Sequence, residues 1–165
     1  MDADAIKQKA GELRAKYGMF GPPVNVFEIA RNEGMDVVYF SPTDDTWDVS
    51  GLLLPDDRRI FLNANEPTDR RAFTLAHELA HLFLDHEPDE YGVYRRGSLY
   101  AAEKTETEKE ADQFAGELLM PKEFLDDLMK RYELTGKDTA VLAKMFVVSQ
   151  AAMAHRLRDL GLLDG

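Results

Sequence analysis

The segment "RAFTLAHELAHLFLDH", residues 71–86, constrains the fold of this chain more than any other part of the sequence. It places His77, Glu78 and His81 in an otherwise almost entirely apolar run, which we expect to form a helix over residues 68–84. Burying ionisable groups among leucine and phenylalanine side chains is costly unless each group finds a partner. The fold must therefore supply a partner for two imidazoles and a carboxylate on one buried helix.

A divalent metal ion is the partner that this spacing favours. Residues four apart on a helix lie about 40° apart around its axis and about 6 Å apart along it, so His77 and His81 can bind one ion. Glu78 points about 100° away from His77, where it can act as general base toward a water that attacks a carbonyl. A chance pairing is the alternative, but His77, His81 and His86 are three of the four histidines in the chain. The spacing is the helix signature of zinc metallopeptidases.

Composition limits what else the chain can be. With 165 residues, of which 44% are hydrophobic, we expect one domain over residues 1–165 with a sizeable core. The sequence has no cysteine, so the ligands of a metal must be His, Asp or Glu. A net charge of −11 disfavours nucleic acid as the main partner. We find no membrane span or export signal, and we expect a soluble, cytoplasmic protein.

The stretch "TETEKEADQFAGELLMP", residues 105–121, is the strongest place to look for a third ligand. Glu108 shares a helix face with the apolar residues Ala111 and Ala115, whereas Glu110 points elsewhere. Asp112, one turn after Glu108, can accept the spare ring N–H of a liganding histidine and so orient that ring. We therefore expect Glu108 as the third ligand and Asp112 as the residue that orients one of the ligand histidines.

Other interpretations of the same stretch remain open. The run "ETEKE" can be a solvated helix start, where glutamates are favoured by the helix dipole alone. Thr105 with Glu108, and Thr107 with Glu110, each fit a capping box. Glu110 is the alternative ligand.

The remaining pattern predicts an α+β fold. Apolar periodicity indicates a helix in the first 17 residues, another near 24–33, and further helices over about 106–119 and 121–132. Three short strands are expected in "MDVVYF", "VSGLLL" and "RRIFLN", the last two as a hairpin around "PDD". Residues 85–104 have no convincing periodicity and are expected to form a long loop.

These segments together resemble the ImmA/IrrE family of metallopeptidases. The matching stretches are "VSGLLLPDDRRIFLNANEPTDRRAFTLAHELAHLFL", "EKEADQFAGELLMP" and "LAKMFVVSQAAMAHRLRDLGLL". The resemblance implies a zincin-like domain with a small three-stranded sheet packed on the metal-binding helix and further helices toward the C-terminus. It also implies His77, His81 and Glu108 as ligands of Zn²⁺ (or Mn²⁺) and Glu78 as general base. Asp112 stands where the family usually has asparagine; both side chains can hydrogen-bond a ligand histidine.

For four further features the sequence allows both a functional and a purely structural role. Residues 138–162 look like a helix-turn-helix with Gln150, Arg156 and Arg158 on its second helix, yet the same residues can simply pack. His86 fits an exposed loop better than a ligand. A tyrosine at 91, 94 or 100 can stabilise an oxyanion or only pack. The strand pair 49–62 can offer an edge to an extended substrate.

The leading hypothesis is a zinc-dependent endopeptidase that cleaves a protein regulator. By family resemblance, the substrate is a helix-turn-helix transcriptional repressor encoded nearby in a mobile element or stress-response operon. The alternative is a non-catalytic regulatory protein that binds a repressor or DNA and has a degenerate metal site. An intact Glu78 favours the enzyme, because a pure scaffold has no use for a general base.

Overall fold

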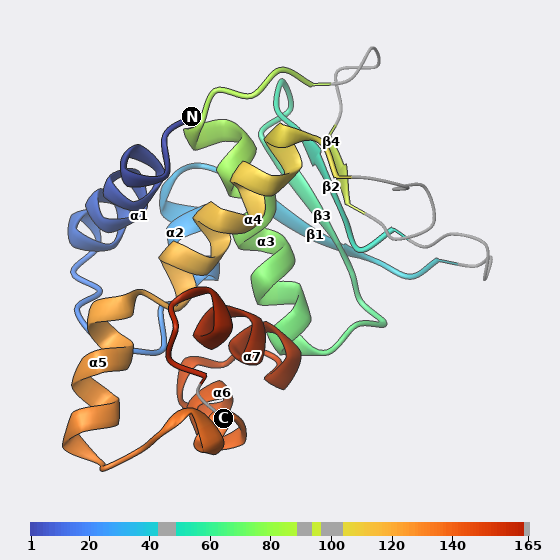
Figure 1. The fold of residues 1–165 in the computed structure, drawn as a ribbon. Coiled ribbons are helices and arrows are strands. Elements are labelled where there is room, and N and C mark those ends of the chain that lie inside the picture. The colour runs from blue at the N-terminus through green and yellow to red at the C-terminus, as the bar shows by residue number, and fades with distance from the viewer. Residues whose placement is uncertain (43–48, 89–93, 97–103, 164–165) are drawn as a thin grey trace.

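The computed structural model describes residues 1–42, 49–88, 94–96 and 104–163 (Figure 1). The elements are, in order, α1 (Ala3–Lys16), α2 (Val26–Asn32), β1 (Asp36–Phe40), β2 (Gly51–Leu54), β3 (Arg59–Asn63), α3 (Thr68–Phe83), β4 (Tyr94–Arg96), α4 (Glu106–Leu119), α5 (Lys122–Arg131), a 3₁₀ turn (Gly136–Asp138), α6 (Thr139–Phe146) and α7 (Gln150–Asp159). The expected α+β class is confirmed, and α3 lies within a residue of the helix expected over 68–84. None of the described helices combines the length and apolar character needed to cross a membrane.

The sheet is mixed, with the strand order β1-β3-β2-β4. β2 and β3 form the expected antiparallel hairpin, and β1 pairs parallel with β3. β4 adds a fourth strand, paired antiparallel with β2, inside the segment that was expected to be loop. A strand of three residues is too short to show periodicity, and its existence depends on the backbone groups that β2 offers it.

The strand arrangement also corrects the idea that the 49–62 hairpin presents a free edge to a substrate. β3 lies between β1 and β2, and β2 is paired with β4 on its other side. Within the described part of the chain the two edge strands are therefore β1 and β4.

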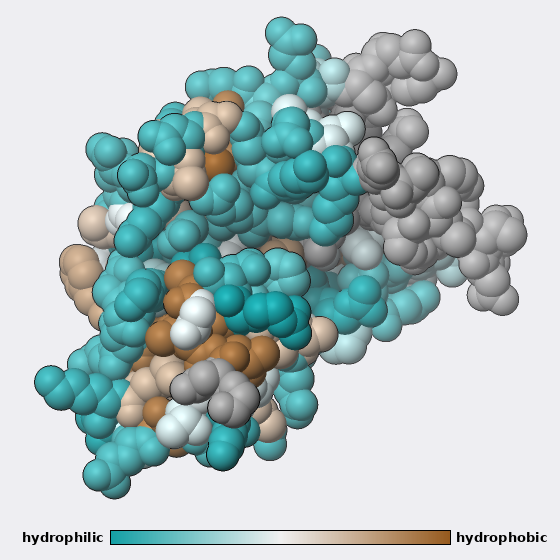
Figure 2. Space-filling model, viewed as in Figure 1, coloured by the Kyte–Doolittle hydropathy of each residue, from teal (hydrophilic) through white to brown (hydrophobic). Residues whose placement is uncertain are grey.

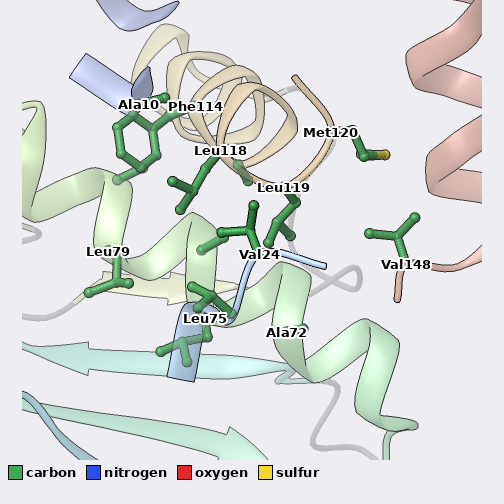
Figure 3. Close-up of a cluster of buried hydrophobic side chains, with 14 of the residues drawn as sticks. Ala10, Val24, Ala72, Leu75, Leu79, Phe114, Leu118, Leu119, Met120 and Val148 are labelled. Atoms are coloured by element: carbon green, nitrogen blue, oxygen red, sulfur yellow. The ribbon is translucent and has the colours of Figure 1, made fainter. Parts of the chain in front are cut away.

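Helices α3 and α4 pack side by side in the centre of the molecule, between the sheet and α1 (Figure 1). Figure 3 shows Phe114 and Leu118 of α4 in the same cluster of buried side chains as Leu75 and Leu79 of α3, and all four are fully buried. This packing fixes the position of α4 relative to α3. Truncating a buried phenylalanine in such an interface costs about 3–5 kcal/mol, so this contact holds the two helices firmly together.

The C-terminal helix α7 is joined to the end of α4 through Arg156. This side chain is 8% exposed, its Nε donates to the carbonyl oxygen of Met120 at 2.9 Å, and it forms an ion pair with Glu117 at 2.8 Å. Arg156 is therefore a packing residue and is not available to read DNA. Gln150 and Arg158 remain exposed, as a recognition helix would require.

The surface over the C-terminal helices is the most apolar part of the face seen in Figure 2, which is otherwise mainly hydrophilic. Val141 in the first turn of α6 and Val147 directly after its last residue are 47% and 41% exposed. The helices α6 and α7 nevertheless contribute Leu142, Phe146 and Leu157 to the same buried cluster as the rest of the protein.

Candidate metal centre

Helix α3 buries all three polar residues of its motif. His77, Glu78 and His81 are 1%, 0% and 2% exposed. The two imidazole rings lie with their centroids 5.0 Å apart and their planes at 76°. One turn of helix therefore places both rings side by side, as the sequence spacing predicted.

Glu108 meets these histidines from the first turn of α4. The Thr105 hydroxyl caps this helix by accepting the backbone N–H of Glu108 at 3.2 Å. The Glu108 side chain has its Oε2 3.0 Å from Nε2 of His77 and its Oε1 3.3 Å from Nε2 of His81. One ligand atom from each of the three residues lies within 4.8 Å of the other two. Among the alternatives in this stretch, the structure brings Glu108 and not Glu110 to the two histidines.

The donor set at this cluster fits a cation. Nδ1 of His77 lies 2.8 Å from Oδ1 of Asp112, and because a carboxylate only accepts, the ring N–H must be on Nδ1. A neutral His77 then directs the lone pair of Nε2 at the carboxylate of Glu108, so two acceptors face each other. A tetrahedral ion with ligands at about 2.0–2.1 Å would separate neighbouring ligand atoms by about 3.3 Å, close to the 3.0 and 3.3 Å between the Glu108 oxygens and the two ring nitrogens.

Asp112 is held from two sides. Its Oδ1 faces His77, and its Oδ2 accepts from the Lys104 ammonium group at 2.5 Å. A carboxylate at this position can serve both partners at once, whereas an asparagine amide nitrogen would face Lys104 with a donor. The ion pair gives a physical reason for Asp112 in this chain.

The surroundings favour the protonation states that metal binding needs. Burial opposes ionisation of Glu108, but the hydrogen bonds that His77 and His81 donate when their Nε2 atoms are protonated outweigh it and hold the pKa of this carboxyl well below its usual range. Burial lowers the pKa of His81, and the hydrogen bond with Glu108 only partly offsets this effect. A hydrogen bond from a ring Nε2 to Glu108 needs a proton there, and a bound cation would replace that proton.

Glu78 lies at the contact between α3 and the sheet. A Cβ atom placed on Gly51 of β2 would meet Cγ2 of Thr74 at 2.5 Å and Oε1 of Glu78 at 3.5 Å. The glycine thus lets the strand approach α3 at the level of the Glu78 carboxylate. Sequence reasoning did not single out Gly51, although a glycine in a strand is a known sign of close backbone approach.

His86 is also placed differently from expectation. Its side chain is 5% exposed, so it is not an exposed loop residue, and it contacts His81 instead of joining the ligand cluster. The tyrosines considered as oxyanion donors cannot be compared, because residues 91 and 100 and the side chain of residue 94 lie outside the described part of the structure.

A cleft of about 990 Å³ borders the cluster. Asp112 and Thr74 line it near the histidines, and Ser149, Ala152 and His155 line it along α7. The cleft therefore runs from Asp112, the hydrogen-bond partner of His77, to the helix-turn-helix-like segment, and its described lining does not include the three candidate ligands or Glu78.

Comparison with known proteins identifies the relatives of this arrangement. The model of the IrrE N-terminal-like domain matches residues 30–158, which include α3, α4 and all but the last residue of α7. The chain belongs to this family. The expected resemblance to IrrE-type metallopeptidases is thereby confirmed, and the matched region contains all five predicted site residues.

Two curated relatives are radiation response metalloproteases IrrE. The one from Deinococcus deserti is 29% identical over 157 residues, covering 94% of this chain and 54% of the relative. The one from Deinococcus radiodurans is 29% identical over 111 residues, covering 66% of this chain and 33% of the relative. This member of the IrrE N-terminal-like family thus spans about half, or less, of the length of these relatives.

A solved structure supports the fold. A Mycobacterium tuberculosis transcriptional regulator superposes with a TM-score of 0.67 at 20% identity, over 93% of this chain and 46% of that one. At this identity the likeness concerns the fold of the IrrE N-terminal-like domain alone.

Proposed function

We propose that this protein is a zinc-dependent endopeptidase, with His77, His81 and Glu108 as metal ligands and Glu78 as general base. The observation that carries the proposal is the convergence of three ligand atoms from α3 and α4 within 4.8 Å, beside a buried glutamate. Two imidazole nitrogens and a carboxylate oxygen suit Zn²⁺, and Mn²⁺ is the alternative that an oxygen ligand allows. When bound, the cation polarises the scissile carbonyl and makes water a stronger nucleophile.

The side chains of this chain account for the proton transfers. The Glu78 carboxylate accepts a proton from the water that attacks the peptide carbonyl carbon. It then delivers this proton to the amine nitrogen of the leaving half as the C–N bond breaks, so one water is consumed for each bond cleaved. Asp112 keeps the N–H of His77 on Nδ1 throughout and so holds that ring in the orientation a ligand needs.

The substrate we propose is a protein, and by family membership a helix-turn-helix transcriptional repressor. The cleft of about 990 Å³ that runs from Thr74 and Asp112 to α7 is large enough for a peptide segment. We propose further that residues 1–165 act as one metallopeptidase domain. The Arg156 contacts with Glu117 and Met120 support this, because they attach the C-terminal helices to α4.

A Glu78→Gln variant tests the catalytic proposal. It keeps the shape of the side chain but removes the base, so metal content should be unchanged while cleavage of a repressor encoded beside this gene is lost. The purified wild-type protein and the purified repressor are incubated with added zinc, and cleavage of the repressor is followed by mass spectrometry. Equal cleavage by Glu78→Gln would remove Glu78 from the mechanism, and no cleavage by the wild-type protein would favour the non-catalytic alternative.

A further inference from the structure

His86 returns to His81 because α3 ends in a tight turn. Asp85 has a left-handed backbone conformation, with φ of 54°, and the backbone N–H of His86 donates to the carbonyl oxygen of His81 at 3.0 Å. The turn carries the His86 ring back over the last turn of α3, where its centroid lies 5.1 Å from that of His81. The ring is buried, with 5% of its side chain exposed.

A chain of two hydrogen bonds links His81 to α4 through this ring. Nδ1 of His81 lies 2.9 Å from Nδ1 of His86, and Nε2 of His86 lies 2.9 Å from Oε2 of Glu110. The other oxygen of Glu110 accepts from the amino group of Met1. Glu110, the alternative ligand in the sequence, thus faces the back of the histidine pair and not the ligand cluster.

The direction of each hydrogen bond follows from the chemistry of Glu110. An ionised carboxylate only accepts, so Nε2 of His86 must donate to it. A neutral imidazole carries one proton, so Nδ1 of His86 is then an acceptor and Nδ1 of His81 must donate to it. This leaves the lone pair of His81 on Nε2, the atom that lies 3.3 Å from Glu108.

We infer that His86 and Glu110 are positioning residues that hold His81 as its Nδ1–H tautomer and reserve its Nε2 for the metal. Asp112 fixes the tautomer of His77 directly, whereas Glu110 fixes that of His81 through the intervening imidazole of His86; we call this pair the relay. The inference rests on the proposed metal site. On this inference the Nδ1 atoms of both histidines are hydrogen-bonded on the side away from the metal, that of His77 to Asp112 of α4 and that of His81 to His86 in the turn that ends α3.

The wild-type protein tests the tautomer directly. Histidine ¹⁵N chemical shifts are recorded on the metal-free protein at about pH 8, above the ordinary pKa of histidine. His81 and His77 should both carry their proton on Nδ1, and His86 on Nε2. A proton on Nε2 of His81 would overturn the inference without any substitution, and without touching the assignment of the ligands.

Substitutions of His86 test the consequence for metal binding. His86→Leu removes the acceptor, and we expect zinc affinity, measured by competition with a chromophoric chelator, to fall roughly 10–100-fold. His86→Asn places an amide oxygen near the position of Nδ1 and should recover most of that loss. Glu110→Ala leaves His86 unanchored and should cause a smaller loss than His86→Leu.

His155→Leu is the matched control, because its side chain is 71% exposed and paired only with Asp159 among the contacts described. It should bind zinc as the wild type does. Circular dichroism of each metal-free variant checks folding, and the tautomer measurement decides the question if His86→Leu does not fold. Wild-type affinity in His86→Leu would refute the relay alone, whereas weak zinc binding by the wild-type protein would refute the proposed function.

Discussion

Oε2 of Glu108 lies 3.0 Å from Nε2 of His77, across the interface between α4 and α3. The two atoms belong to helices that are held together by an extensive apolar contact, so their separation is set by core packing as much as by the polar groups themselves.

Replacing Glu108 by alanine should lower zinc affinity by more than the roughly 10–100-fold that is typical of changes behind the ligands. The variant loses one of three proposed ligand atoms, while the helix start remains capped by Thr105. Competition with a chelator measures the affinity. Glu106→Ala on the same turn is the control, since its side chain is 82% exposed and should not affect the metal. Full zinc occupancy in Glu108→Ala would show that another group completes the site.

Asp112 should tolerate asparagine better than alanine. Asp112→Asn keeps an oxygen that can accept Nδ1–H of His77, so the affinity for zinc should fall only slightly, mainly because the ion pair with Lys104 is lost. Asp112→Ala removes the acceptor and should cost roughly 10–100-fold in affinity. Isothermal titration of the metal-free proteins compares the three chains. If alanine and asparagine have equal effects, the hydrogen bond to His77 does not orient the ring.

Acidification should destabilise the metal-free protein below about pH 6.5, because the pKa of His81 is lowered from its ordinary value of 6.5 in the folded state. Just below that value the unfolded chain binds a proton that the buried ring does not, so the free energy of unfolding falls. Glu108, whose pKa is also lowered, adds a second loss below its ordinary value of 4.5. Urea unfolding with a chelator present, from about pH 8 to about pH 5, follows the first effect.

Two variants test whether His81 causes the dependence of stability on pH. His155→Ala changes an exposed histidine and should leave the dependence on pH intact. His81→Asn should flatten the dependence above about pH 5. An unchanged slope in His81→Asn would assign the effect to another group.

Gly51→Ala should destabilise the protein by roughly 1–3 kcal/mol, the usual cost of overpacking. The added methyl group would lie 2.5 Å from Cγ2 of Thr74, and neither the strand nor α3 can move without disturbing the site. Thr74→Ser removes that Cγ2 atom, so the double variant Gly51→Ala/Thr74→Ser should be more stable than the sum of the single changes predicts.

Gly21→Ala serves as the matched control for this glycine, because a Cβ at position 21 has nothing within 4 Å. Urea unfolding of the wild-type protein and the four variants measures their stabilities. Simple additivity of the Gly51 and Thr74 effects would mean that the two atoms do not meet.

The order of the elements was predicted well because each depends on local periodicity. The hairpin of β2 and β3 and the metal-binding helix α3 all lie where apolar spacing and turn residues placed them. β4 was missed because it is defined by hydrogen bonds to β2 and not by its own pattern. The role of Arg156 stayed open between DNA reading and packing, because its contacts with Glu117 and Met120 are ones that no local pattern encodes.

The sequence by itself determined the group on α3: His77, Glu78 and His81 share one helix, and helical geometry alone fixes how their side chains project. Only the tertiary structure decided which glutamate of α4 joins them. Glu108 and Glu110 lie about 200° apart around that helix, so the rotation at which α4 packs on α3 sends the first to the histidine pair and the second behind it to His86. That rotation is set by buried apolar side chains such as Phe114 and Leu118, which lie on the same helix as the two carboxylates but do not contribute to the metal site.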